Sequence, residues 1–159
     1  MDGARTIALA GLAIDPDDVT LLHFLGMIEA KSGSLAAAQA LFTRATVASP
    51  EFGPALISLA RLLDRSVDMV ALAALSRPAP AGAMGNEYLL LRARARGATG
   101  DTDGAATDHA ELAARHPGDR AMWLGAARAL AEVASGSKPR AGRVSSIGND
   151  LARYVLDGT

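Results

Sequence analysis

The stretch from Val19 to Pro50 reads VTLLHFLGMIEAKSGSLAAAQALFTRATVASP and contains two runs whose apolar residues recur at helical spacing. The positions that mark these two faces are Leu22, Leu25, Gly26 and Ile28, followed by Leu35, Ala38, Leu41, Phe42 and Ala45. Gly33 lies between the runs and can adopt the left-handed conformation that ends a helix. Pro50 ends the second run. We therefore predict a helix–turn–helix unit over this stretch, in which the small residues Gly26 and Ala38 allow the two helices to cross closely.

The unit recurs along the chain. Pro50 follows Pro16 by 34 residues, and Pro117 follows Pro50 by 67, which corresponds to one step of 34 and one of 33. Each of these prolines comes after an alanine-rich helical run. A single hairpin cannot bury both of its faces, so a chain with this period is expected to stack hairpin on hairpin.

The Val19–Pro50 unit resembles one repeat of the tetratricopeptide repeat (TPR) family, whose paired helices recur every 34 residues. The residues that carry the resemblance are Leu25, Gly26, Gly33, Ala38, Phe42, Ala45 and Pro50. The chain departs from the family at Leu22, where tryptophan is frequent, and at Glu29, where tyrosine is frequent. The resemblance extends from about Ala4 to about Leu130. It implies an all-α, TPR-like right-handed superhelix of antiparallel helix hairpins, with three to four repeats and terminal capping helices. A generic helical bundle is the alternative.

We predict a single domain that spans residues 1–159. Its expected parts are an N-terminal helix at 3–16, a repeat at 19–50, an irregular repeat at 53–84, a repeat at 86–117, and a degenerate repeat at 119–156 with a linker at 135–143 and a C-terminal helix. The second helix of the irregular repeat should be short, with Ser66 as its N-cap. The lone first helix either caps the array or belongs to a longer chain.

Composition limits the classes of partner. The formal net charge is −1, so bulk attraction to nucleic acid or to a membrane surface is not expected. There are no cysteines, which fits a reducing compartment, and we expect a cytoplasmic protein. Residues 6–14 have the apolar character of a signal-peptide core, but Asp2 offsets Arg5 and the positive leader is missing. No apolar run reaches transmembrane length.

No enzyme motif is found in the sequence, and we predict no catalytic residues, metal or cofactor for this chain. The segment Gly100–Gly104 has the look of a calcium loop but lacks its acidic ligands, so a turn equivalent to the one at Gly33 is expected. His23, His109 and His116 lie in separate helices without the spacing of metal ligands. His109 is expected to be a packing residue and His116 to lie at the end of its helix.

Three arginines alternate along the stretch LLRARARG, namely Arg92, Arg94 and Arg96. Residues two apart on a helix do not share a face, so these side chains should spread around the helix rather than form a nucleic-acid site. We expect them to lie on a solvated face.

The TPR resemblance implies that the first helix of each hairpin lines a concave groove in which peptides bind. Carried onto this chain, the groove presents His23, Met27, Lys31, Ile57, Arg61, Arg65, Leu90, Arg94, Leu124 and Arg128. Five of these residues are basic, whereas the acidic residues fall mostly on second helices and turns. Such a surface suits an extended segment with acidic groups and apolar anchors. The asparagines of the carboxylate-clamp TPR domains are missing, so binding of chaperone tails is not predicted.

The expected function is that of a non-catalytic protein–protein interaction module, an adaptor or scaffold that binds a peptide or protein segment. Two alternatives stay open. The chain can be the substrate-recruiting domain of a larger enzyme, because TPR arrays are joined to protein glycosyltransferase, sulfotransferase and Asp/Asn hydroxylase domains. It can also be a self-assembling scaffold, a homo-oligomer joined through its exposed ends.

Overall fold

Helices are the regular secondary structure of the described part of the chain. The structure is a computed structural model that describes residues 2–136, and within that range it contains eight helices and no strand. The helices are α1 (Asp2–Ile14), α2 (Val19–Ser32), α3 (Leu35–Ala48), α4 (Gly53–Arg65), α5 (Met69–Ala73), α6 (Gly82–Ala98), α7 (Thr102–Arg115) and α8 (Arg120–Gly136). The chain is therefore all-α over the described range, as its alanine- and leucine-rich sequence predicts.

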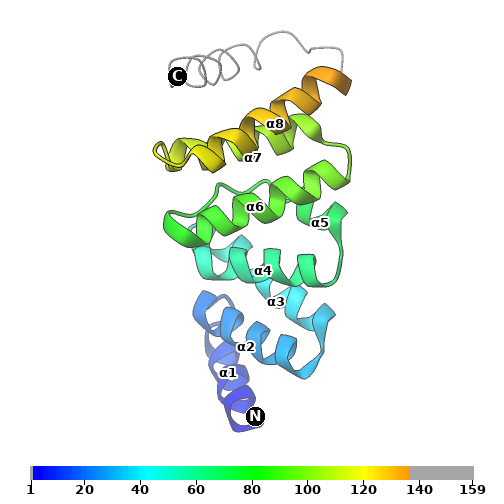
Figure 1. Cartoon of the computed structure of the whole chain (residues 1–159). Coiled ribbons are helices and arrows are strands. Elements are labelled where there is room, and N and C mark those ends of the chain that lie inside the picture. Colours follow the sequence, from blue (N-terminus) through cyan, green and yellow to red (C-terminus); the bar gives the residue numbers. More distant parts are fainter. Residues whose placement is uncertain (1, 137–159) are drawn as a thin grey trace.

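The helices form one elongated stack, with α1 at one end and α8 at the other (Figure 1). Each helix packs against the next one in the sequence, and further contacts join α2 to α4 and α4 to α6. Helices α2, α4 and α6 are the first helices of successive hairpins, so they lie next to one another along the stack. This arrangement is compatible with a helical repeat fold.

Three of the turns between helices have the same construction. Gly33, Val67 and Gly100 adopt positive φ angles of 87°, 57° and 86°. The amide that follows each of them donates to the carbonyl five residues earlier: Ser34 to Glu29 (2.9 Å), Asp68 to Leu63 (2.9 Å) and Asp101 to Arg96 (2.8 Å). These turns are 34 and 33 residues apart. Steps of the same two lengths account for the spacing of Pro16, Pro50 and Pro117. Val67 thus occupies a position that favours glycine, although a β-branched residue is strained there.

Aspartates begin the helices after the second and third turns. Asp68 accepts a hydrogen bond from the Ala71 amide at 3.0 Å, so the predicted N-cap, Ser66, is wrong. Ser66 instead follows the last residue of α4, and α5 begins two residues later than a Ser66 cap requires. In the third turn the Asp101 carboxylate accepts from the Gly104 amide at 2.9 Å. The residues with the look of a calcium loop therefore form the helix–helix turn that was expected.

The first hairpin, α2 and α3, is held by close apolar packing. Gly26 faces the buried ring of Phe42, and a Cβ added to Gly26 would lie 2.5 Å from Phe42 Cε1. Ala38 on the same side of α3 is completely buried, as is Leu22 on α2. The sequence predicted this crossing from the small residues at Gly26 and Ala38, and the prediction is confirmed.

The third hairpin, α6 and α7, is held differently at the same register. Arg92 and Asp108 lie 67 residues after Leu25 and Leu41, and so take the positions of that leucine pair. Both are buried, and Arg92 donates from Nε to Asp108 Oδ2 at 2.9 Å and from Nη2 to Oδ1 at 2.6 Å. A bidentate ion pair therefore replaces two leucines in this interior.

This pair corrects the prediction of a solvated arginine face. Arg94 is exposed, as expected, but Arg92 is buried and Arg96 is half-buried. Arg96 Nη1 also donates to Asp108 Oδ1, at 2.8 Å. Two of the three arginines turn inward because one buried carboxylate on α7 accepts hydrogen bonds from both.

Helix α5 has only five residues, and the chain from Ala74 to Ala81 is not helical. The short second helix of this repeat was predicted. Arginine side chains from α6 and α7 bind the carbonyl oxygens of this segment and of the end of α5. The hydrogen bonds are Arg92 Nη1 to Leu75 (3.1 Å) and to Arg77 (2.9 Å), Arg115 Nη1 to Pro80 (2.7 Å), Arg115 Nη2 to Ala79 (3.1 Å) and Arg96 Nε to Ala73 (3.5 Å). Tyr88 Oη also donates to the carbonyls of Leu75 and Arg77.

Several helix ends differ from the expected boundaries. Helix α1 ends at Ile14 rather than at residue 16, and α6 begins at Gly82, four residues before the predicted start at residue 86. The added turn of α6 contains Gly85, whose missing side chain leaves space for the Pro80 carbonyl. Helix α8 continues to Gly136, past the predicted start of the linker at residue 135. The remainder of that linker and the predicted C-terminal helix lie outside the described residues.

Candidate functional site

The ten residues predicted to line a groove lie on four helices, α2, α4, α6 and α8. They are distributed as His23, Met27 and Lys31 on α2, Ile57, Arg61 and Arg65 on α4, Leu90 and Arg94 on α6, and Leu124 and Arg128 on α8. Four of them, Met27, Lys31, Arg61 and Arg65, come together around one open cavity of about 400 Å³ between α2 and α4. The cavity is the strongest candidate for a ligand site among the described residues.

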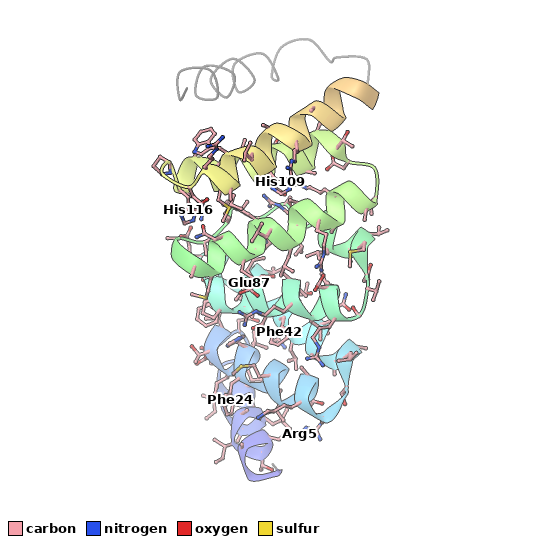
Figure 2. The ribbon with its side chains drawn as sticks, in the orientation of Figure 1. Arg5, Phe24, Phe42, Glu87, His109 and His116 are labelled. Atoms are coloured by element: carbon pink, nitrogen blue, oxygen red, sulfur yellow. The ribbon has the colours of Figure 1, made fainter. Side chains whose placement is uncertain are left out.

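The cavity combines an apolar floor with a basic rim. The buried side chains of Phe42 and Leu62 line it together with Met27, Ala30 and Ser58. In Figure 2, Phe42 lies in the interior of the stack next to α4. Such a surface offers both van der Waals contact to an apolar side chain and ionic contact to a carboxylate.

The cations around the cavity are not equivalent. Lys31 and Arg65 are exposed, and within residues 2–136 neither has an ion-pair partner. Arg61 donates from Nε to Glu87 Oε1 and from Nη2 to Glu87 Oε2, each at 2.6 Å. These hydrogen bonds lower the pKa of Glu87 and raise that of Arg61, so both groups stay ionised at neutral pH.

A second ion pair crosses between the same two helices. Arg94 of α6 pairs with Asp64 of α4, while Glu87 of α6 pairs with Arg61 of α4. Asp64 and Glu87 are therefore acidic residues on first helices, where few were expected. The predicted basic surface therefore keeps charges at Lys31 and Arg65 that are unpaired as far as the structure describes the chain, whereas ion pairs between α4 and α6 neutralise Arg61 and Arg94.

Ile57 is the predicted groove residue that the structure contradicts. Its side chain is only 3% exposed and belongs to the main hydrophobic core. Helix α4 packs against α2, α3, α5 and α6, and Ile57 is buried in the core that these helices share. Its counterparts by repeat register, Leu90 and Leu124, are 44% and 40% exposed.

His23 lies at the junction of α2 and α4 rather than on an open surface. Its Nε2 is 2.9 Å from Ser58 Oγ, and its ring contacts those of Phe42 and Phe52 with centroids 5.7 Å apart in both cases. Burial lowers the pKa of His23, so the imidazole is neutral at pH 7. His23 therefore joins two hairpins as a half-buried polar contact.

Besides Ala30, Phe42 and Leu62, which line the cavity, three further residues of this region were not among the predicted ones. Phe24 is an exposed aromatic residue on α2 beside His23, Ser58 lines the cavity, and Glu87 neutralises Arg61 (Figure 2). An exposed phenylalanine could have been suspected from its position next to a groove residue. Glu87 is three residues before Leu90, one helical turn away on the same face, and this spacing is the signal that could have identified it.

A second cavity, of about 490 Å³, lies where α6 begins and α7 ends. It is lined by Asn86, Arg115 and His116 together with residues 79, 81 and 82. His116 ends α7, as predicted, and its Nε2 is 2.7 Å from Asn86 Nδ2. Arg115 already donates to two loop carbonyls and to Glu111, so this cavity offers a ligand fewer free donors than the first.

Comparison with known proteins gives no assignment. No protein-family model matches the chain. No curated protein matches it either. Between residues 2 and 136, no helix has the length and apolarity needed to cross a membrane, and no group of three or more His, Cys, Asp or Glu side chains is placed to hold a metal ion.

Proposed function

We propose that the chain is a TPR-like helical repeat protein that binds an extended peptide or protein segment along its first helices. The repeat assignment is supported by the equivalent turns at Gly33, Val67 and Gly100 and by the stacking of the hairpins that these turns connect. The TPR-like superhelix and the role as an interaction module belong to the same proposal.

One observation carries the ligand assignment. The cavity between α2 and α4 places Lys31 and Arg65 beside the apolar surface of Met27, Phe42 and Leu62, and neither cation has an ion-pair partner in the described part of the chain. Lys31 and Arg65 are related by one 34-residue step, so they stand at the same level of neighbouring helices. The ligand that fits is a peptide segment with an aspartate or glutamate next to an apolar side chain.

A selection from a random-peptide library on the immobilised protein tests this proposal. We expect enrichment of sequences with Asp or Glu next to Leu, Met or Phe. The double variant Lys31→Glu/Arg65→Glu should lose binding of the selected peptides by at least tenfold, because two attractive charges become repulsive.

The control is Arg44→Glu/Arg120→Glu, which makes the same charge change at exposed positions of α3 and at the start of α8; because it also breaks the Arg44–Asp17 ion pair, its circular dichroism spectrum must match that of the original chain. It should retain binding. Selected peptides without acidic residues, or equal losses in both double variants, would contradict the assignment of the ligand to the cavity.

A further inference from the structure

Glu87 forms an ion pair with Arg61, which is one of the three cationic side chains that line the cavity. Its two carboxylate oxygens accept from Nε and Nη2 of Arg61, each at 2.6 Å, which is the geometry that a bound carboxylate would also adopt. Figure 2 shows Glu87 on the side of α6 that faces α4. The side chains of Arg61 and Glu87 are 57% and 40% exposed, so the pair can open without disturbing the core.

We infer that Glu87 is a built-in competitor for the carboxylate of the ligand, and that it restricts strong anion binding in the groove to Lys31 and Arg65. This inference rests on the function proposed above. It adds a specificity-determining residue on α6, a helix that contributes none of the residues lining the cavity.

Binding of a ligand carboxylate at Arg61 is an exchange of one ion pair for another. A ligand carboxylate that approaches Arg61 must first displace Glu87, and it then makes the same bonds that are lost, so the net gain is small. At Lys31 and Arg65 a carboxylate displaces only water and counterions. The groove should therefore select ligands whose acidic group lies near the ends of α2 and α4, and discriminate poorly among groups placed at Arg61.

The second crossed ion pair provides an internal control. Arg94 and Asp64 join the same two helices, but neither lines the cavity. Removing the charge of Asp64 frees an arginine and changes the net charge in the same way as removing that of Glu87. Only the Glu87 change should therefore affect a ligand held in the cavity.

Two synthetic nine-residue peptides serve as probes, one with adjacent glutamates flanked by leucines and one with glutamines in their place. Fluorescence anisotropy at low salt gives their affinities for the original chain and for the Glu87→Gln and Asp64→Asn variants. Glu87→Gln should bind the glutamate peptide about two- to fivefold more tightly, the range expected when one exposed ion pair becomes available. Its affinity for the glutamine peptide should not change, and Asp64→Asn should bind both peptides as the original chain does.

An NMR titration adds a readout at the arginine itself. The Arg61 Nε–H signal should shift on addition of the glutamate peptide in Glu87→Gln and stay in place in the original chain. An unchanged affinity in Glu87→Gln, with binding still lost in Lys31→Glu/Arg65→Glu, would overturn the role of Glu87 and leave the proposed function standing. Equal affinity of the original chain for both peptides would overturn the acidic ligand itself, and with it this inference.

Discussion

The first and third hairpins share one register but are held together by opposite chemistries. In α2 and α3, the ring of Phe42 packs directly on Gly26, and Leu25 and Leu41 occupy the positions beside this crossing. In α6 and α7, Ala93 and His109 take the positions of Gly26 and Phe42, while Arg92 and Asp108 take those of the two leucines. The two hairpins therefore share a register, whereas the polarity of the residues at these positions differs.

The reason for the difference lies in the hairpin between them. Helix α5 stops after five residues, and the segment that follows leaves carbonyl groups without helical partners. Arg92 satisfies two of them while its other nitrogens bind Asp108. A leucine at this position could not donate to these carbonyls, so the shortened helix and the ionic interior belong together.

The largest expected effect comes from breaking the buried ion pair. Asp108→Ala leaves the Arg92 charge buried without its carboxylate and should lower the free energy of unfolding by about 3–5 kcal/mol. Urea denaturation followed by circular dichroism measures this loss. The double variant Arg92→Leu/Asp108→Leu installs the residues of the first hairpin and removes both buried charges, while Arg96 keeps its hydrogen bond to the Gly104 carbonyl. It should lose no more than about 2 kcal/mol, roughly the bonds to the loop carbonyls. If it loses as much as Asp108→Ala, the two interiors are not interchangeable.

An intermediate effect is expected at the helix crossing of the first hairpin. Gly26→Ala forces a Cβ against the buried Phe42 ring and should lower the free energy of unfolding by about 1–3 kcal/mol. The double variant Gly26→Ala/Phe42→His introduces the residue types of Ala93 and His109 from the third hairpin. Its free energy of unfolding should fall by less than the sum of the losses in the two single variants.

Gly125→Ala is the control for this crossing. No described atom outside the helix's own backbone and the glycine's chain neighbours lies within 4 Å of its Cβ, and the variant should gain about 0.5–1 kcal/mol from helix propensity alone. The same loss in both alanine variants would mean that contact with Phe42 is not the cause. Denaturation midpoints at equal m-values provide the measurement.

The smallest effect concerns the polar contact between the first hairpin and α4. Burial lowers the pKa of His23 below its ordinary value of 6.5, so the unfolded chain binds this proton more readily than the folded one. Stability should therefore fall as the pH decreases from 6.5 to the lower pKa of the folded state. Subtracting the pH profile of His23→Gln from that of the original chain isolates this contribution. A difference that is flat between pH 7 and pH 5 would show that His23 does not titrate differently on folding.

Sequence reasoning located the features that depend on local spacing. The turn at Gly33, the crossing at Gly26 and Phe42, and the shortened helix after α4 all follow from small residues, prolines and apolar periodicity within one repeat. The Met27, Lys31, Arg61 and Arg65 side chains that share a cavity could be named because the TPR resemblance implies which face of each first helix lines a groove.

The sequence did not reveal which residues pair with the charged side chains. Arg92 looked like one of three surface arginines because its carboxylate is on another helix and its carbonyl partners are on a non-helical segment. Arg61 and Arg94 looked available because Glu87 and Asp64 reach them only across the α4–α6 contact. Burial of Ile57 likewise depends on the helices that cover α4. These are properties of packing between repeats, and no spacing within one repeat encodes them.

The hydrogen bonds that hold the segment from Ala74 to Ala81 should lower its rate of proteolysis. A protease needs an extended stretch of backbone, and a non-helical connection is ordinarily where one is found. Here the carbonyls that a protease must bind are already held by Arg92 and Arg115, side chains of two different helices. The segment becomes accessible only when α6 and α7 separate from it. Its rate of cleavage should therefore report the separation of the third hairpin from this segment rather than the mobility of a loop.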